Sequence, residues 1–415
     1  MKISGHDSGV LQELGRKLVE ISEDPVNQKR IRLWKRLNRR ERVKPPVFIY
    51  EIPWHEMNVD GELTIRTEGV LCRDIEGMMR MTIYQWNHMQ GDMVVEPVIY
   101  SPLAVKDSGF GITEDVDTSS TDKSSSVVSR HFNIQIRDEA DIAKIKTPVI
   151  EYDAAKSNEI FGALSEVFDD IILVKKGGYR RLNFNAWDEL VRWTGTQEAL
   201  MDMALRPEYI HALMDRLTGA YIARLDQFDR YGLLRSNNDN SFGSSGGLGY
   251  TDMLPVKGDD EQVHPSDCWG RSMSQIFSEV SPEMHDEFAL QYEMRWLKKF
   301  GVTYYGCCEQ LHKKVGILRM IPHLKKISMS PWIDFEEAVE NIGTDYVFSF
   351  KPNPAHLAWD QWNPGKVREY LEEKLEITRP CAVEIILKDI STVRYQPQRL
   401  WEWSRIACEV SERYA

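Results

Sequence analysis

Short hydrophobic runs alternate with amphipathic stretches along most of the chain. Runs rich in β-branched and aromatic residues predict buried strands, and stretches with an apolar residue every third or fourth position predict helices. Eight strand-like runs are separated by helix-like segments, and they cover residues 93–100, 180–184, 233–240, 262–268, 302–307, 326–330, 346–350 and 382–388. This alternation is typical of a parallel α/β protein, and the count of eight predicts a (β/α)8 TIM barrel.

The first 90 residues have a different pattern. Helical periodicity covers residues 9–21 and 25–40, and short strand-like runs follow at 47–52 and 62–71. We therefore expect an N-terminal helical extension, residues 1–90, packed on a barrel of residues 91–415. A long insertion is expected at about 101–170, because residues 101–129 are rich in Ser, Asp and Gly and lack periodicity. A loop of this length is often functional, so a lid over the site is one interpretation.

Composition narrows the classes of function. The formal net charge of -12 argues against a nucleic-acid partner, because no broad basic face can offset it. No apolar run approaches the length that crosses a membrane, and the first ten residues lack the apolar segment of a signal peptide. Six cysteines, two of them adjacent, are typical of thiols in a reducing compartment. We expect a cytoplasmic protein.

The most informative stretch is VTYYGCCEQLH, residues 302–312. Its strand-like beginning stops at Gly306, so Cys307 and Cys308 should lie at the carboxyl end of a strand, where parallel α/β enzymes carry their chemistry. Successive strand residues point to opposite sides, so the two cysteines cannot both face the barrel axis if the strand continues through them. Glu309 and His312 follow in the loop and are candidates for partners that orient a ligand.

Two further candidate ligands close earlier strand-like runs. Asp239 lies at the end of one run and Cys268 at the end of the next, so both are predicted near Cys308. One carboxylate and two thiolates suit Zn²⁺, and three protein ligands leave an open position for catalysis. The alternative is a pair of buried cysteines and a loop aspartate. The spacing leaves both interpretations open.

Aromatic residues are frequent at the predicted strand ends. Some must belong to the core, but their density favours a flat, apolar ligand. The candidate substrate-binding residues are Phe184, Trp187, Phe242, Trp269, Tyr305 and Trp332.

The eight-strand order, the N-terminal extension and the strand-end sequence YYGCCEQ resemble the uroporphyrinogen decarboxylase superfamily. The chain is most similar to its cobalamin-dependent branch, and there to the methyltransferase I component of corrinoid-dependent aromatic O-demethylases from anaerobic bacteria. This resemblance implies a zinc site of Asp239, Cys268 and Cys308. It also implies a corrinoid protein as partner, which would dock over the open end of the barrel and take the methyl group of a methoxyarene. Zinc would polarise the ether oxygen, and Glu309 or His312 would protonate it.

Departures from the superfamily patterns bear on the alternatives. Methyltransferases that act on thiols carry His-x-Cys and a late cysteine, where this chain has Gly306 and Lys388. Porphyrinogen decarboxylases carry an arginine-rich segment near the first strand, and residues 96–105 contain no arginine. A metal-free decarboxylase using Arg180, Arg181 or Arg394, a methyltransferase with another donor or a thiol, and a non-catalytic binding subunit remain as alternatives. A homodimer is left open.

Overall fold

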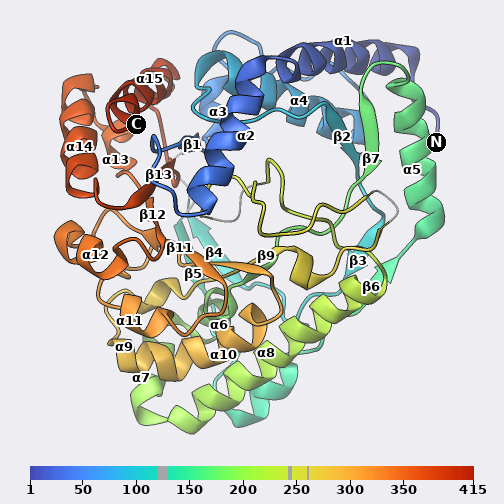
Figure 1. Cartoon of the computed structure of the whole chain (residues 1–415). Coiled ribbons are helices and arrows are strands. Elements are labelled where there is room, and N and C mark those ends of the chain that lie inside the picture. Colours follow the sequence, from blue (N-terminus) through green and yellow to red (C-terminus); the bar gives the residue numbers. More distant parts are fainter. Residues whose placement is uncertain (120–128, 242–244, 259–260) are drawn as a thin grey trace.

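The computed structural model describes residues 1–119, 129–241, 245–258 and 261–415 (Figure 1). Its centre is a seven-stranded sheet in which every neighbouring pair is parallel. The strand order is β1 (Val47–Ile49), β13 (Ala382–Leu387), β12 (Val347–Phe350), β11 (Leu324–Met329), β10 (Val302–Tyr305), β9 (Trp269–Ser272) and β8 (Asn183–Phe184). The predicted parallel α/β architecture is thus confirmed.

The closed eight-stranded barrel is not shown in the part of the chain that the structure describes. β2 (Val98–Ser101) pairs in parallel with β7 (Leu173–Lys176), outside the seven-stranded sheet. The predicted strand at 233–240 contributes a single parallel bridge between Leu234 and Tyr179. The predicted strand at 62–71 is also wrong, because α4 (Val70–His88) begins there after an irregular segment.

The predicted strand at 262–268 is replaced by a 3-10 turn, Pro265–Asp267, and the strand begins only at Trp269. Proline cannot donate a ladder hydrogen bond, which disfavours a central strand here. The Asp267 carboxylate accepts a hydrogen bond from the backbone N–H of His264 at 3.0 Å, which stabilises the turn. Cys268 therefore lies before β9, not at its end.

Helices surround the sheet. Local signals set their ends: the Ser4 side chain accepts a hydrogen bond from the backbone of Asp7 at the start of α1, and Asp24 does the same for Val26 in α2. The helices are α1 (Gly5–Ser22), α2 (Pro25–Asn38), α3 (Trp54–Met57), α4, α5 (Ala154–Val167), α6 (Ala186–Thr194), α7 (Thr196–Leu205), α8 (Pro207–Arg230), α9 (Pro282–His285), α10 (Gln291–Leu297), α11 (Val315–Leu318), α12 (Phe335–Ile342), α13 (Ala355–Ala358), α14 (Pro364–Ile377) and α15 (Gln398–Glu412). Within the described residues none of them is long and apolar enough to cross a membrane.

The insertion between β2 and β7 contains more regular structure than the polar composition of residues 101–129 predicts. β3 (Val105–Asp107) pairs antiparallel with β6 (Ile150–Tyr152), and β4 (Val116–Ser119) pairs antiparallel with β5 (Ser129–Phe132). Residues 120–128 of the predicted lid lie outside the described residues. The lid stays a prediction.

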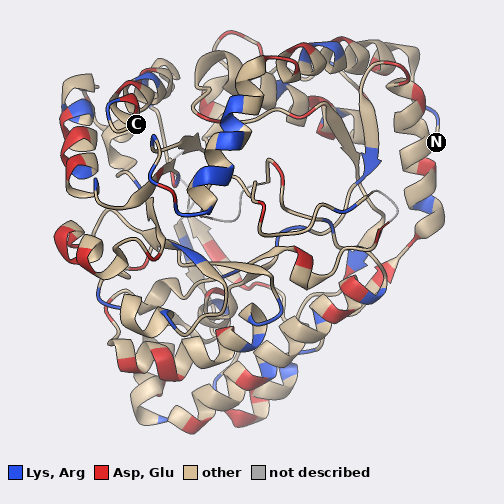
Figure 2. Ribbon diagram, in the orientation of Figure 1, with Lys and Arg blue, Asp and Glu red and all other residues tan. Residues whose placement is uncertain are grey.

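The seven-stranded sheet has two very different faces. The outer face packs on helices: Phe348 of β12 stacks on Phe335 of α12, and Tyr305 of β10 hydrogen-bonds Glu293 of α10. The inner face is polar, and it carries Arg271, Tyr304, Lys326, Ser349 and Glu384 from β9 to β13. Figure 2 shows several Lys and Arg residues along α2.

Candidate functional site

The carboxyl ends of β1, β9, β10, β11, β12 and β13 share one edge of the sheet, because these strands are parallel. We call this edge the rim. At the end of β10 the chain turns at Gly306, whose φ of 95° lies in the region that favours glycine. The turn places Cys307 and Cys308 on the rim beside the end of β13.

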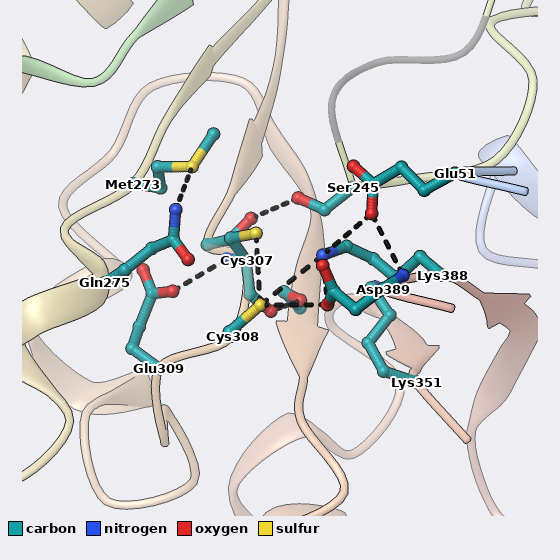
Figure 3. A network of polar contacts seen from close by, with 12 residues as sticks. Glu51, Ser245, Met273, Gln275, Cys307, Cys308, Glu309, Lys351, Lys388 and Asp389 are labelled. Carbon is teal, nitrogen blue, oxygen red and sulfur yellow. Dashed lines mark hydrogen bonds and ion pairs between the residues drawn. The ribbon is translucent and has the colours of Figure 1, made fainter. Parts of the chain in front are cut away.

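Five rim residues form a thiol–ammonium cluster: Cys307, Cys308, Lys388, Asp389 and Glu51 (Figure 3). The two sulfurs lie 3.5 Å apart. The Cys308 thiol donates a hydrogen bond to the Asp389 carboxylate at 3.3 Å. Lys388 Nζ lies 2.5 Å from Asp389, 3.4 Å from the Cys308 sulfur and 3.6 Å from Glu51. One buried cation is thus surrounded by a thiol pair and two carboxylates.

The cluster shifts the pKa values of its thiols in opposite directions. The interaction between the two sulfurs lowers the pKa of Cys307 and raises the pKa of Cys308. Loss of both protons would place two negative charges 3.5 Å apart, so the pair carries at most one thiolate. Burial acts to lower the pKa of Lys388, but the two sulfurs and the two carboxylates together raise it above its usual value. Lys388 therefore stays charged at neutral pH.

The backbone is strained at two of these five residues. Glu51 has a φ of 53° and Asp389 a φ of 56°, both in the left-handed region that non-glycine residues rarely adopt. They follow the neighbouring strands β1 and β13, and the backbone N–H of Asp389 donates to the Glu51 carboxylate at 3.0 Å. Strained residues that other contacts hold in place cluster at functional sites. This strain supports the rim as the candidate active site.

Glu309, a predicted catalytic residue, is fully buried. One carboxylate oxygen accepts from the backbone N–H of Cys307 at 2.8 Å, and the other accepts from that of Ser274 at 3.2 Å. Burial raises the pKa of Glu309. Glu309 ties the end of β10 to the end of β9, and so it positions the cysteine pair.

The structure places His312 away from the cluster. Its side chain is buried, with Nε2 3.7 Å from Glu337 of α12, and its backbone carbonyl accepts from Asn341 of the same helix. Burial lowers the pKa of His312. The structure does not bring His312 together with the predicted partners Cys308 and Glu309.

The three predicted zinc ligands do not converge. Trp269 pairs with Val302 in the parallel ladder, so Cys268 lies before β9 at the amino end of the sheet, whereas Cys308 lies on the rim at the opposite end. Cys268 is fully buried, and burial raises its pKa to about 12. Asp239 is held by Arg235 at 2.5 Å and by the backbone of Ser241 at 2.7 Å.

Among the residues that the structure describes, no three His, Cys, Asp or Glu side chains are grouped to hold a metal ion. The predicted ligand set therefore does not fit zinc in this fold. The Lys388 ammonium supplies a cation next to Cys308. The rim thus has a fixed positive charge built from the chain itself.

Most of the predicted substrate-binding aromatics belong to the core. Phe184 packs against Tyr221, Trp187 against Phe277, and Tyr305 lies between the sheet and α10. Trp269 is buried on the inner face, with its Nε1 donating to the carbonyl of Gly249. Trp332, which follows β11, is 63% exposed and stays a candidate, and Phe242 lies outside the described residues.

Sequence reasoning missed Glu51, Lys351, Lys388 and Asp389 as parts of the site. Each follows directly after a parallel strand or lies one residue further. Cys307 and Cys308 were located by the rule that functional residues lie at the carboxyl ends of parallel strands. The same rule, if it is applied to the ends of β1, β12 and β13, finds these residues as well. Their charged side chains at the end of apolar runs were the available signal.

Lys351 gives a test of the burial of this region. Its Nζ donates to Tyr304 Oη at 3.0 Å and to Ser349 Oγ at 2.6 Å, and burial lowers its pKa to about 7. The unfolded chain keeps a lysine pKa of about 10.4. Between these values the unfolded state binds more protons, so Lys351 makes stability increase as the pH rises from about 7 to about 10.

We expect Lys351→Met to lack this increase. The free energy of unfolding of the variant, relative to that of the native protein, should therefore fall as the pH rises. Urea unfolding of both proteins at pH 7 and pH 9.5 measures the difference. The other titrating groups occur in both proteins, so their contributions to the pH dependence cancel in the difference. A difference in unfolding free energy that is the same at both pH values would show that the Lys351 pKa is not depressed.

Comparison with known proteins gives little guidance. No protein family profile and no curated protein sequence matches the chain. One similar solved structure is a methyltransferase from Methanosarcina mazei, with 12% sequence identity and a TM-score of 0.48. The match covers 92% of this chain and 98% of that one. Both the identity and the TM-score are too low to assign a family or an activity.

Proposed function

We propose that this protein is a methyltransferase that takes the methyl group of an aromatic methyl ether and passes it to the reduced corrinoid of a partner protein. The observation that carries the proposal is the thiol–ammonium cluster on the rim. It combines shifted pKa values with backbone strain, and these features mark functional sites. The resemblance of the YYGCCEQ segment supports the choice of methyl transfer.

Cleavage of an aryl methyl ether requires help for the leaving oxygen. The C–O bond breaks with its electron pair on oxygen, and this leaves a phenolate whose conjugate acid has a pKa of about 10. A fixed donor placed where this charge develops lowers the barrier. Lys388 is such a donor, because it is charged and its side chain is only 3% exposed. Its contact with Glu51 is the longest of the three, at 3.6 Å, so the ether oxygen can replace Glu51 there.

The Cys307–Cys308 pair has two roles in this proposal. It holds the Lys388 ammonium by charge and by a 3.4 Å contact with the Cys308 sulfur. Its thiolate is also a nucleophile, and attack on the methyl carbon would form an S–CH3 bond while the phenolate leaves. This covalent route is the second candidate, and it makes the thiol itself the first methyl acceptor.

A reduced corrinoid would supply the strong nucleophile that methyl ethers otherwise require, and Cys308, which is partly exposed, marks where it could approach. The carboxylate of Glu309 keeps the cysteine backbone in place. No step is assigned to zinc, because Asp239, Cys268 and Cys308 lie apart.

The proposal is tested by incubating the protein with methoxyarenes labelled with ¹³C in the methyl group and with a reduced corrinoid protein. We expect one free phenol for each reduced corrinoid consumed. Cys268→Ala is the matched control, because it removes a cysteine at the other end of the sheet and should keep the activity. Unchanged methoxyarene, or release of CO2 from a carboxylated arene instead, would contradict methyl transfer. Mass spectrometry of the peptide with Cys307 and Cys308 separates direct transfer from the covalent route.

A further inference from the structure

Arg271 is a buried guanidinium whose Nε has no hydrogen-bond partner among the described residues. It lies in β9 on the inner face of the sheet and is 4% exposed. Within the described residues its Nε is buried without a hydrogen-bond partner, and no ion pair involves its side chain. Buried charges in proteins are normally paired, since an unpaired one costs several kcal/mol. The position therefore calls for an anion.

The neighbouring groups leave the inner face short of negative charge. Lys326 and Lys351 face the same space as Arg271. Glu384 is bonded there to Lys326 at 2.6 Å, to the Ser349 hydroxyl at 2.5 Å and to the backbone N–H of Gly247 at 3.3 Å. These three hydrogen bonds hold the Glu384 carboxylate away from hydrogen bonding with Arg271. Burial lowers the pKa of Arg271 to about 10, so the guanidinium stays charged at neutral pH.

A small, narrow cavity lies next to Arg271. Its lining includes the Trp269 and Tyr304 side chains, Lys326, and the backbone of residues 246–249. A Cβ on Gly246 would lie 2.9 Å from the Tyr304 ring, so residues 246–249 approach the sheet as closely as only glycine allows. While this segment stays in place the cavity cannot hold a water molecule. A ligand enters only if the segment shifts.

We propose that Arg271 binds the carboxylate of a small organic acid on the inner face of the sheet. A guanidinium presents paired N–H donors that match the two oxygens of a carboxylate. The same surroundings already bind one carboxylate, that of Glu384. The aromatic side chains of Trp269 and Tyr304 give the cavity apolar walls, and these suit the hydrocarbon part of the acid.

The Ser245 side chain connects the site to the rim. The Ser245 hydroxyl, next to residues 246–249, donates to the carbonyl of Gly306 at 2.7 Å, and Cys307 follows directly. A shift of the segment on ligand binding therefore reaches the cysteine pair. The inference does not depend on which reaction the rim carries out.

The experiment measures thermal unfolding and isothermal binding of the full chain with acetate, benzoate and benzamide at constant ionic strength. Benzamide is the neutral counterpart of benzoate. We expect the carboxylates to raise the unfolding midpoint, as any ligand of the native state does, and benzamide to leave it unchanged. Tighter binding of benzoate than of acetate would indicate that the site takes an aromatic acid. No binding of either carboxylate to the native protein at 20 mM, on the order of the weakest physiological affinities, would overturn the proposal.

Variants identify the site. Arg271→Met should weaken carboxylate binding at least about 10-fold, the effect of losing one charged hydrogen-bonding partner. Without ligand it should be no less stable than the native protein, because an unpaired buried charge is removed. Arg271→Lys should keep part of the binding. Arg180→Met is the matched control, since Arg180 already contacts Ser241 and Asp239. Equal carboxylate binding in Arg271→Met and native protein would place the anion elsewhere.

Discussion

Lys388→Met is expected to lower methyl transfer by about 10²- to 10³-fold, the usual effect of removing one fixed donor from a developing oxyanion. The ammonium is the cation that contacts Cys308 on the rim, at 3.4 Å, and methionine keeps the length of the side chain without its charge. The fold should survive, because both carboxylates that pair with Lys388 are about half exposed and can be solvated. The measurement is the rate of phenol release under saturating methoxyarene.

Lys388→Arg and Glu51→Gln make this test specific. Arginine keeps the charge, so Lys388→Arg should recover part of the rate. Glu51→Gln should change the rate little, because the ether oxygen is proposed to displace Glu51 from its 3.6 Å contact. Phenol release by Lys388→Met within about threefold of the native rate would remove Lys388 from the mechanism, since one lost donor normally costs far more.

Glu384→Gln is expected to lower the free energy of unfolding by about 3–5 kcal/mol, because removing one partner of a buried ion pair leaves the other charge uncompensated. Lys326 Nζ lies 2.6 Å from Glu384, with side-chain exposures of 3% and 0%. Glutamine keeps the size of the side chain and most of its hydrogen bonds. The decrease in unfolding free energy therefore measures the effect of removing the charge. Urea unfolding measures it.

The double variant Lys326→Met with Glu384→Met is the control for this pair. Replacing both members of a buried ion pair by apolar groups is often close to neutral, so the double variant should recover much of the loss. Glu41→Gln removes an exposed ion pair with Arg36 and should cost far less stability than Glu384→Gln. A loss in Glu384→Gln as small as that in Glu41→Gln would show that the inner face is well solvated.

The sequence predicted elements best where a single periodicity runs between clear stop signals. The helix predicted at 25–40 is observed as α2, Pro25–Asn38, and the strand predicted at 302–307 contains β10. The same-edge rule for parallel strands then placed Cys307 and Cys308 on the rim. Cys268 was misplaced because residues 262–268 hold few apolar residues and a proline, and such a run does not fix where a strand begins.

The charged interior could not be predicted from the sequence. Glu384 lies within an apolar run, and Arg271 and Lys326 lie in strands of mixed polar and apolar residues. In either setting the charge is compatible with both faces of a strand. Their burial and pairing depend on which strands are neighbours: β10 to β13 must lie side by side before Lys326 can reach Glu384. Local pattern carries no information on that order.

The most direct test of the central claim is the pH dependence of cysteine alkylation by iodoacetamide, followed by peptide mass spectrometry. The chain supplies its own reference, because burial raises the pKa of Cys72, Cys381 and Cys408 to about 11 and that of Cys268 to about 12. We predict that the Cys307–Cys308 peptide takes up one label with an apparent pKa below the usual value of about 8.5. Lys388→Met should move that pKa upward. A Cys307–Cys308 peptide that reacts like an ordinary cysteine, with the same profile in Lys388→Met, would contradict a thiolate held by the Lys388 ammonium.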